Sequence, residues 1–369
     1  MKILISINTS WNIINFRLGL LKSLQKEGFE IIVLAPKDEY SDSFKDHGFQ
    51  YCDINMNNKG TNPIEDLKLT IDYFKILKEV KPELILNYTI KPNIYGTIAA
   101  NLLNIPTINN IAGLGTLFVN ENFVTKIAKF LYKYSQSKAK FVFFQNNEDF
   151  ELFTSQKLVD ARKCDILPGS GVDTTKFVPI EVPKKDDTFR FLLISRMLWD
   201  KGIQEYIDAA KEIKKKYKNV EFQLLGFLDV SNKTAISKEQ MDIWVKEGIV
   251  NYLGTSDNVK NEISKCDCIV LPSFYREGTP RTLLESASMA KPIITTNNIG
   301  CKDVVDHNTN GYLCEVKNSI DLANQMEKMI NLTVDERTTM GNKGREKVIN
   351  EFDETIVINK YKQVINKVI

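Results

Sequence analysis

Short apolar runs that alternate with longer amphipathic stretches are the feature that most constrains what this chain can fold into. Ile3–Ile7 is a run of strand type, Phe16–Lys26 has helical spacing, and Glu30–Ala35 returns to a strand. The alternation continues through a helix at Leu67–Glu79 and strands at Leu84–Asn87, Thr107–Ile111 and Phe141–Gln145. Such an order is typical of βαβ units that build a parallel sheet.

The alternation restarts in the second half of the chain. Residues 179–187 contain Pro179 and Pro183 and show no periodicity, which is typical of a linker. Strand-like and helical stretches then follow at Phe189–Ile194, Gly202–Lys216, Val220–Leu225, Val250–Leu253, Asp267–Leu271 and Pro292–Thr295. We therefore expect an α/β protein with two Rossmann-like, doubly wound domains, residues 1–175 and 176–369, that face each other across a cleft.

The end of the chain is expected to be helical. Thr333 and Glu336 match a capping box. A last helix at Phe352–Val368 carries an apolar stripe, so it can pack on a domain face and return to the N-terminal domain.

Composition excludes several classes of protein. The chain has 49 basic and 47 acidic residues, a net charge of +2, which argues against a nucleic-acid-binding protein that relies on overall basicity. The apolar stretch at residues 3–7 is too short for a signal peptide, and there is no run of about 18 apolar residues, so we expect a cytoplasmic protein or one that lies on a membrane surface. Six irregularly spaced cysteines indicate reduced thiols, and the two histidines lie in no cluster of metal-ligand spacing.

Residues 271–285 carry the strongest chemical signal. A strand ends, a loop with Glu277 follows, and a helix begins, for which Thr279 can be the N-cap and Pro280 the first residue. A helix start offers unpaired N–H groups to an anion. Glu277 and Glu285 flank this start, so each can accept hydrogen bonds from hydroxyls of a nucleotide sugar. The alternative is an ordinary strand–loop–helix with two surface glutamates.

A second motif lies at the end of the first strand of the second half. Arg196 and Lys201 flank the loop between this strand and the next helix. Two cations at the carboxyl end of a strand can neutralise a diphosphate, and arginine suits bidentate contact. The alternative is that both are solvated surface charges.

A basic amphipathic stretch spans Glu121–Lys140. Apolar residues form one stripe of this expected helix, and lysines form another: Phe123, Ile127, Phe130, Leu131 and Tyr134 against Lys126, Lys129, Lys133 and Lys140. Such a helix can lie on an anionic membrane surface. The alternative is a helix whose apolar stripe packs on the sheet while its lysines face water.

These motifs resemble a known family. The spacing of Glu277 and Glu285, set in residues 276–281, resembles that of the retaining glycosyltransferases of family four, which have the GT-B fold, and the loop from Arg196 to Lys201 resembles their diphosphate-binding loop. Residues 171–173 resemble the motif at their domain junction. More weakly, residues 15–17, 35–40, 91–96 and 113–115 resemble a subgroup that builds lipid-linked bacterial glycans. This subgroup includes α-1,3-N-acetylgalactosaminyltransferases that act on undecaprenyl-diphosphate-linked diacetylbacillosamine.

The resemblance implies the site residues. Arg196, Lys201 and Glu277 would be catalytic, and the donor would contact Gly278, Thr279, Pro280, Arg281, Thr282 and Glu285. For the acceptor side we expect Arg17, Lys91, Asn109, Asn110, Gly113 and Gly115. The cations Arg17 and Lys91 could meet an acceptor diphosphate, or either could equally be a member of a structural ion pair. On the basic helix, Lys126, Lys129 and Lys133 are the expected membrane contacts. Many family members carry a histidine near the strand at 107–113, but His47 and His307 both lie elsewhere, so no histidine role transfers.

The activity implied is transfer of a sugar, N-acetylgalactosamine as the best guess, from a UDP-sugar to an undecaprenyl-diphosphate-linked acceptor, with retained configuration. No metal or other cofactor is implied. The acceptor would be attacked from the face that the diphosphate leaves, with the donor phosphate taking the acceptor proton and Glu277 orienting the sugar. The protein would then lie on the inner face of the cytoplasmic membrane.

Three other readings stay open at this point. A nicotinamide enzyme would need a Gly-x-Gly-x-x-Gly turn after the first strand, and residues 8–12 contain no glycine. A UDP-sugar epimerase or hydrolase can share the two-domain fold. A non-catalytic subunit that binds a nucleotide sugar is the third, although Arg196, Lys201, Glu277 and Glu285 argue against it.

Overall fold

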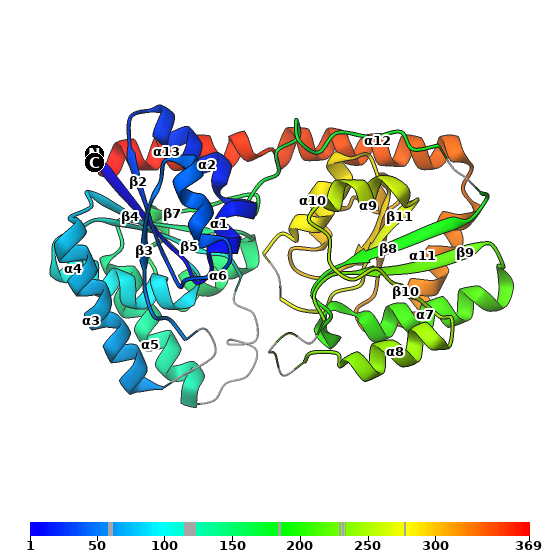
Figure 1. Ribbon diagram of the computed structural model, residues 1–369, viewed down its shortest axis with the longest axis horizontal. Helices are drawn as coiled ribbons and strands as arrows, with labels where there is room; N and C mark the ends of the chain where they lie inside the picture. Colours follow the sequence, from blue (N-terminus) through cyan, green and yellow to red (C-terminus); the bar gives the residue numbers. More distant parts are fainter. Residues whose placement is uncertain are drawn as a thin grey trace. The chain divides into compact units, whose positions relative to one another are not determined.

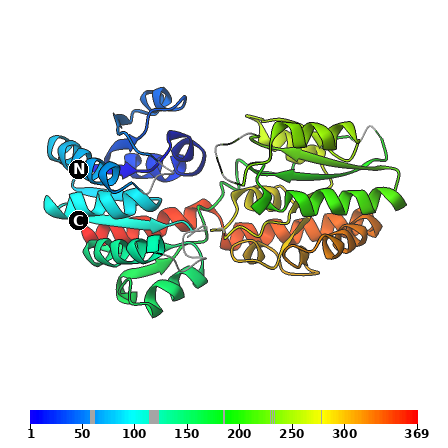
Figure 2. The same cartoon turned by 90° about the horizontal axis from the view of Figure 1, so that it is seen from below.

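The computed structural model describes residues 1–57, 62–113, 123–183, 186–228, 230, 232, 234–276 and 278–369. The chain forms two compact units, residues 1–171 with 354–369, and residues 172–353. The last helix, α13 (Glu354–Val368), therefore belongs to the N-terminal unit, and in Figures 1 and 2 it lies in red among the blue and cyan elements.

A parallel seven-stranded sheet forms the centre of the N-terminal unit. Its strand order is β3-β2-β1-β4-β5-β6-β7. The strands are β1 (Lys2–Ser6), β2 (Glu30–Ala35), β3 (Gln50–Asp53), β4 (Leu84–Tyr88), β5 (Thr107–Ile111), β6 (Phe141–Phe144) and β7 (Cys164–Ile166). Connections leave β1 toward β2 and β4 toward β5, in opposite directions along the sheet. The carboxyl ends of β1 and β4 therefore form a switch point, where open α/β sheets bind ligands.

Helices cover both faces of this sheet. One face packs against α1 (Ser10–Phe16), α2 (Leu18–Lys26) and α13, through a core that includes Ile5, Leu21 and Tyr361. The other face carries α3 (Pro63–Val80), α4 (Thr97–Leu102), α5 (Phe123–Lys138) and α6 (Asn147–Ser155). The sheet is apolar on both faces because helices bury both, as parallel sheets require.

The C-terminal unit has a parallel six-stranded sheet of order β10-β9-β8-β11-β12-β13. The strands are β8 (Phe189–Ile194), β9 (Val220–Leu225), β10 (Asn251–Tyr252), β11 (Cys268–Leu271), β12 (Ile293–Thr296) and β13 (Gly311–Cys314). The connections again diverge at the central pair, β8 and β11, which lie side by side with Ile269 opposite Leu192. The loops that follow these two strands therefore meet at one edge of the sheet.

Two layers of helices enclose this sheet as well. Residues of α7 (Ile203–Lys216), α8 (Lys238–Lys246) and α11 (Ser319–Asn331) pack on one face. Residues of α9 (Val259–Lys265), α10 (Arg281–Ser288) and α12 (Val334–Glu351) pack on the other. The capping box predicted at Thr333 and Glu336 is confirmed at the start of α12.

The predicted doubly wound α/β units and most of their strands are confirmed. The predicted single helix at Phe16–Lys26 was wrong at its start, because α1 already begins at Ser10 and the chain breaks at Arg17 before α2. Thr9 accepts a hydrogen bond from the N–H of Asn12 at 3.3 Å and so caps α1 three residues after β1 ends.

Three residues of the predicted apolar stripe of α5 face outward, whereas Leu131 packs against the core; the Phe123 side chain lies outside the described residues. Ile127, Phe130 and Tyr134 are 45%, 69% and 44% exposed. The opposite face of the helix is buried and carries small, polar or aromatic side chains: Thr125, Ala128, Tyr132, Ser135 and Gln136. The alternative in which the apolar stripe packs on the sheet is therefore wrong for these three residues.

Within the described residues, the helices are too short or too polar to cross a membrane.

Two glycines of α12 differ in the room around them. A Cβ atom on Gly341 would lie 1.9 Å from the carbonyl oxygen of Ala290, whereas the nearest atom to one on Gly344 is 3.7 Å away. We expect Gly341→Ala to lower the free energy of unfolding by about 1–3 kcal/mol, because the backbone must move. Gly344→Ala should leave it unchanged or raise it by up to about 1 kcal/mol through helix propensity. Urea denaturation of both variants measures this; equal effects would contradict the close packing of α12 on Ala290.

Candidate functional site

The loop after β8 carries the two predicted cations. Arg196 is exposed, and its guanidinium makes no hydrogen bond or ion pair with the part of the chain that the structure describes. Lys201 ends a 3₁₀ turn, Trp199–Lys201, and is only 8% exposed. Its Nζ lies 5.2 Å from the centre of the Tyr275 ring, over the ring face. One cation is thus open to solvent and the other is held against an aromatic ring of the second motif.

Backbone hydrogen bonds join the loop after β8 to the loop after β11. The carbonyl oxygen of Asp200 accepts hydrogen bonds from the N–H groups of Phe274 and Tyr275, both at 3.0 Å. The two motifs, 75 residues apart, are thereby fixed side by side, as their places at the ends of neighbouring strands predict.

Gly202 makes this approach possible. It lies in the left-handed region at φ 76°, and a Cβ atom on it would lie 2.1 Å from the carbonyl oxygen of Pro272. Only glycine meets both demands without strain. Gly226, after β9, approaches Ser195 in the same way, with a Cβ position 1.8 Å from its carbonyl oxygen. The ends of β8, β9 and β11 therefore meet through backbone contacts.

The helix that follows the second motif begins one residue later than predicted. α10 starts at Arg281, and Pro280 is its N-cap, with ψ at 119° and no side-chain hydrogen bond. The predicted roles of Thr279 as N-cap and Pro280 as first residue were therefore wrong. Proline lacks a side-chain acceptor, so the first N–H groups of α10 lack a side-chain cap from this position.

Glu285 lies on α10 and is 9% exposed. Its carboxylate accepts a hydrogen bond from Arg281 Nε at 3.0 Å, one turn earlier on the helix. Burial raises the pKa of this carboxyl above its ordinary value, while the Arg281 guanidinium favours the charged form. Arg281, predicted as a donor contact, thus also orients Glu285.

Four further predicted residues need placing. Glu277 and Gly115 lie outside the described residues. Gly278 and Thr282 are partly buried on either side of the start of α10.

Two side chains that the sequence did not single out support the loop after β11. Thr296 Oγ1 donates to the carbonyl oxygen of Ser273 at 2.5 Å, and Asn298 Nδ2 donates to that of Tyr275 at 3.0 Å. Both lie at or just after the carboxyl end of β12. The sequence could have pointed to these two residues, because polar side chains at the end of a strand often support a site.

Most of the predicted acceptor residues that the structure describes have protein partners. Lys91 pairs with Asp66 at 2.7 Å, and both side chains are largely buried. Asn109 Nδ2 donates to Gln136 at 2.8 Å, and Asn110 Nδ2 donates to the Tyr361 hydroxyl at 2.9 Å. Gly113 follows β5 at φ 102°. Asn109 and Asn110 thus belong to a buried polar network, and Lys91 to an ion pair.

Arg17 differs from these residues. It lies between α1 and α2, is 6% exposed, and has its guanidinium 4.6 Å from the centre of the Tyr88 ring.

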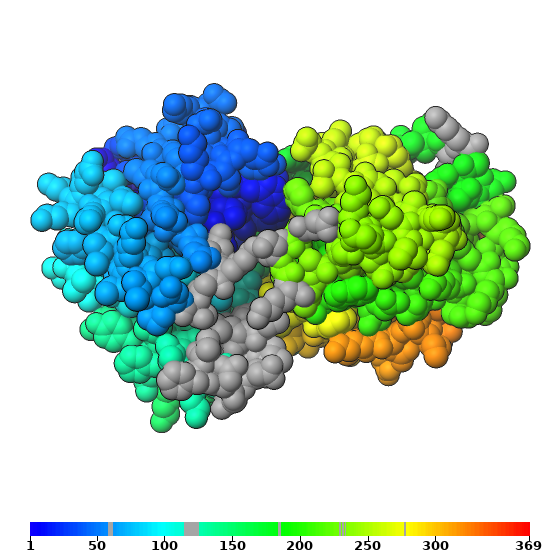
Figure 3. Space-filling model, turned by 60° about the horizontal axis from the view of Figure 1, so that its bottom comes forward, coloured from blue at the N-terminus to red at the C-terminus, as the bar shows by residue number. Residues whose placement is uncertain are grey.

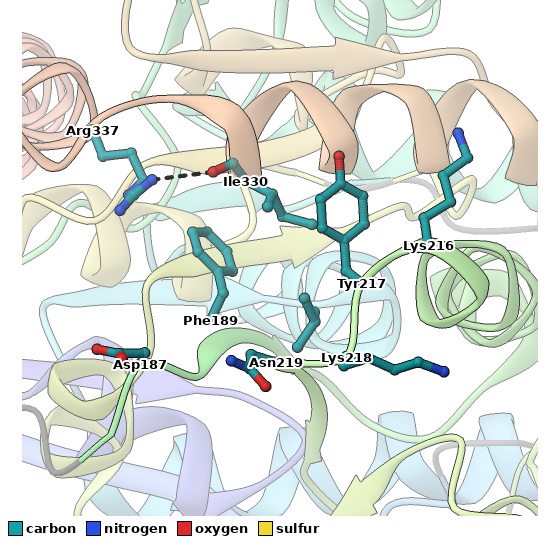
Figure 4. A pocket seen from close by; sticks show the side chains of 9 residues that line it. Asp187, Phe189, Lys216, Tyr217, Lys218, Asn219, Ile330 and Arg337 are labelled. Atoms are coloured by element: carbon teal, nitrogen blue, oxygen red, sulfur yellow. Dashed lines mark hydrogen bonds between the residues drawn. The ribbon is translucent and has the colours of Figure 1, made fainter.

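A shallow hollow lies at the other edge of the C-terminal sheet. Asp187, Asn219 and Lys218, just before β8 and β9, line it together with Arg337 (Figure 4). Arg337 Nη1 donates to the carbonyl oxygen of Ile330, and its guanidinium lies over the Phe189 ring. Because this hollow lies at the amino ends of the strands, it is separate from the loops that carry Arg196 and Lys201.

Among the described residues, no three His, Cys, Asp or Glu side chains are grouped so as to hold a metal ion.

Two doubly wound units, with the last helix returned to the first, are the architecture of the GT-B glycosyltransferases. The structure of Anabaena Alr3699/HepE, solved in complex with UDP, is similar to the whole chain with a TM-score of 0.79 at 18% sequence identity, covering 100% of both chains. This likeness shows the fold.

Family comparison identifies the class of enzyme. Residues 175–347 match the family model described as glycosyl transferases group 1, and residues 2–146 match that described as glycosyl transferase 4-like. The chain belongs to this family of retaining glycosyltransferases, which use nucleotide sugars.

Two relatives are similar to this chain over most of their length. N,N'-diacetylbacillosaminyl-diphospho-undecaprenol alpha-1,3-N-acetylgalactosaminyltransferase of Campylobacter jejuni is 28% identical, over 97% of this chain and 96% of the relative. UDP-Gal:alpha-D-GlcNAc-diphosphoundecaprenol alpha-1,3-galactosyltransferase of Escherichia coli is 26% identical, over 82% of this chain and 81% of the relative.

Gly202 and Gly248 form a matched pair for testing the contact between the two loops. Both have positive φ, but a Cβ atom on Gly248 meets nothing within 4 Å. We expect Gly202→Ala to lower kcat/KM for the nucleotide sugar by about 100-fold, because the loops after β8 and β11 must separate by a fraction of an ångström or more. Gly248→Ala should cost about 1–2 kcal/mol of stability and leave kcat/KM unchanged. Similar kinetic effects of both variants would contradict the loop contact as the cause.

Proposed function

We propose that this glycosyltransferase moves a sugar from a UDP-sugar to an undecaprenyl-diphosphate-linked sugar in bacterial glycan assembly. The proposed sugar is N-acetylgalactosamine. The similarity to the C. jejuni enzyme along 97% of the chain carries this proposal. The name of the E. coli relative also contains a diphosphoundecaprenol acceptor, and in addition it gives a UDP-linked donor, galactose. This relative therefore supports the acceptor class more than the choice of sugar.

On the donor side, Arg196 and Lys201 would neutralise the diphosphate of the UDP-sugar. Arg196 supports this role because it is exposed at the carboxyl edge of the sheet with its five donors unused by the described residues. The first N–H groups of α10, which the N-cap Pro280 cannot cap with a side chain, would add donors for the same charge. Such fixed donors stabilise negative charge as it develops on the leaving diphosphate.

The reaction would break the bond between the anomeric carbon and the diphosphate oxygen and form a bond to the acceptor hydroxyl on the same face. The hydroxyl proton would pass to the departing phosphate oxygen. Glu277 would orient the sugar, and Glu285, fixed by Arg281, would accept hydrogen bonds from the ribose.

The N-terminal unit would bind the acceptor and the membrane surface. α5 presents Ile127, Phe130 and Tyr134 to the outside, and residues 123–138 contain four lysines and no acidic residue. On α3, Ile64, Leu67 and Ile71 are 79%, 63% and 46% exposed. Figure 3 shows part of this surface, with the light-blue α3 region and the blue-green α5 region. Exposed apolar side chains beside lysines are typical of contact with an anionic bilayer.

A panel of UDP-sugars tests the activity. We expect the purified chain to transfer one N-acetylhexosamine to a short polyprenyl-diphosphate-linked sugar, with mass spectrometry showing the product and NMR showing retained configuration. Release of UDP at the same rate without acceptor would support a hydrolase instead.

Arg196→Ala tests the donor site. We expect kcat/KM for the UDP-sugar to fall by about 100- to 1,000-fold, because a donor to the leaving diphosphate is lost, with unchanged thermal stability since the side chain is exposed. Lys218→Ala, at the hollow of Figure 4, is the control and should have no effect. If kcat/KM fell with Lys218→Ala but not with Arg196→Ala, the donor would have to bind at the other edge of the sheet.

Liposome flotation tests the membrane surface. We expect the protein to bind anionic but not neutral vesicles, and Phe130→Ser to weaken binding by about tenfold, since an exposed phenyl ring no longer enters the bilayer. Ile320→Ser is the control, because Ile320 is 71% exposed on α11 of the C-terminal unit. Equal binding of all three proteins would contradict the role of α5.

A further inference from the structure

Arg17 is a buried cation to which the described residues supply no acidic partner. Within the part of the chain that the structure describes, its one side-chain hydrogen bond runs from Nη1 to the carbonyl oxygen of the neighbouring Phe16, at 3.3 Å. Its Nε is enclosed and has no hydrogen-bond partner, and no carboxylate of the described residues forms an ion pair with it. Because a buried charge is costly unless it is paired, this guanidinium is suited to an anion that comes from outside the chain.

The Arg17 side chain lies beside the switch point of the N-terminal sheet. Its Cζ lies 4.6 Å from the centre of the ring of Tyr88, the last residue of β4. β4 pairs with β1, with Asn87 opposite Ser6. The ring presents its negative face to the guanidinium, and this contact uses none of the N–H donors of Arg17. The charge therefore lies where an open α/β sheet binds its ligand, with donors left over.

Two more polar groups near this edge have no hydrogen-bond partner among the residues that the structure describes. Asn12 Oδ1, in the first turn of α1, and Thr89 Oγ1, directly after β4, are enclosed and unpaired. Thr89 also has φ 65°, a conformation that is costly for a β-branched residue. A strained residue with an unpaired buried hydroxyl is a feature that functional sites show.

Three other features in the described part of this unit that could attract an anion already have a carboxylate beside them. At the start of α1, Asp38 Oδ2 accepts hydrogen bonds from the N–H groups of Ser10 and Trp11, at 2.8 and 3.2 Å. This carboxylate takes the place that a phosphate would otherwise occupy. Lys91 is paired with Asp66. Glu354 lies near the start of α2, its carboxylate 2.6 Å from where a Cβ on Gly19 would be.

We propose that Arg17 binds the diphosphate of the lipid-linked acceptor, with Asn12 and Thr89 hydrogen-bonded to the hydroxyls of the sugar next to it. This inference rests on the proposed function for the identity of the ligand. It assigns the diphosphate to Arg17 rather than to Lys91, Asn109 or Asn110. A narrow cavity between the start of α2 and α13 borders the Arg17 side chain and is also lined by Glu354.

Arg17→Lys in the full-length protein is the first test. Lysine keeps the charge but loses the planar fork that matches phosphate oxygens. We expect the KM for a polyprenyl-diphosphate-linked sugar to rise by about 10- to 100-fold, as for loss of a charged hydrogen bond, while kcat changes less and the dissociation constant of UDP stays within about twofold. Arg17→Ala should have the larger effect.

Arg162→Ala is the matched control. Arg162 is the other arginine of residues 1–171, is exposed, and pairs with Asp160 at the amino end of β7. It should leave KM, kcat and UDP binding unchanged. Melting temperatures identify any unfolding, and if Arg17→Ala is unfolded the comparison rests on Arg17→Lys.

Binding of farnesyl diphosphate and farnesyl monophosphate, measured by calorimetry, tests the anion site without turnover. We expect the wild type to prefer the diphosphate and Arg17→Lys to lose that preference. If Arg17→Lys changes neither the KM for the acceptor nor the preference for the diphosphate, the inference is overturned. It is also overturned if the affinity for UDP falls by as much as the KM for the acceptor rises, because Arg17 would then bind the donor. Normal diphosphate binding without transfer to any diphosphate-linked acceptor would instead count against the proposed function alone.

Discussion

The carbonyl oxygen of Pro272 lies where a side chain on residue 202 would have to be, and the candidate donor site depends on that contact. A left-handed glycine lets the chain turn from β8 into α7 against the loop that leaves β11. The Asp200 carbonyl oxygen then accepts hydrogen bonds from two N–H groups of that loop, and Lys201 lies over the Tyr275 ring. Each of these contacts is a backbone or short-range one, so a small displacement of either loop separates the groups that would hold a diphosphate.

The two units use the same topology differently at their switch points. In the C-terminal unit the loop after the first strand carries Lys201 and an exposed Arg196, and the N-cap of α10 is a proline without a side-chain acceptor. In the N-terminal unit the helix after the first strand is already capped by Thr9 and by the carboxylate of Asp38. A carboxylate there repels phosphate. In the proposed arrangement, an anion near β1 and β4 binds Arg17. The side chain of Arg17 reaches the end of β4 from the break between α1 and α2.

Asparagines at the ends of β4 and β5 show why polar residues at strand ends are ambiguous in sequence. Asn109 and Asn110 stand where ligand contacts are expected. In the structure their amides are used within the protein: Asn109 bonds Asn87, Thr97 and Gln136, and Asn110 bonds Tyr361 of the last helix. The same network explains α5. Gln136 and Ser135 must face inward to take part in it, so the more apolar stripe with Phe130 faces outward. Burial of this helix follows hydrogen bonding, because an unpaired buried amide costs more than an exposed aromatic ring.

The amino-acid sequence by itself determined the βαβ order, the two doubly wound units and the loops after β8 and β11, because apolar periodicity and the parallel sheet together specify which loops share an edge. It also singled out Arg196, Lys201 and the stretch with Glu285 as candidate site residues through residue type and spacing. Tertiary structure alone decided which polar groups are already paired: Lys91 by Asp66, Glu285 by Arg281, and Asn110 by Tyr361, 251 residues away. It also decided that Arg17 is buried with no acidic partner among the described residues. Pairing depends on contacts between residues far apart in the chain, and no local pattern of side chains encodes it.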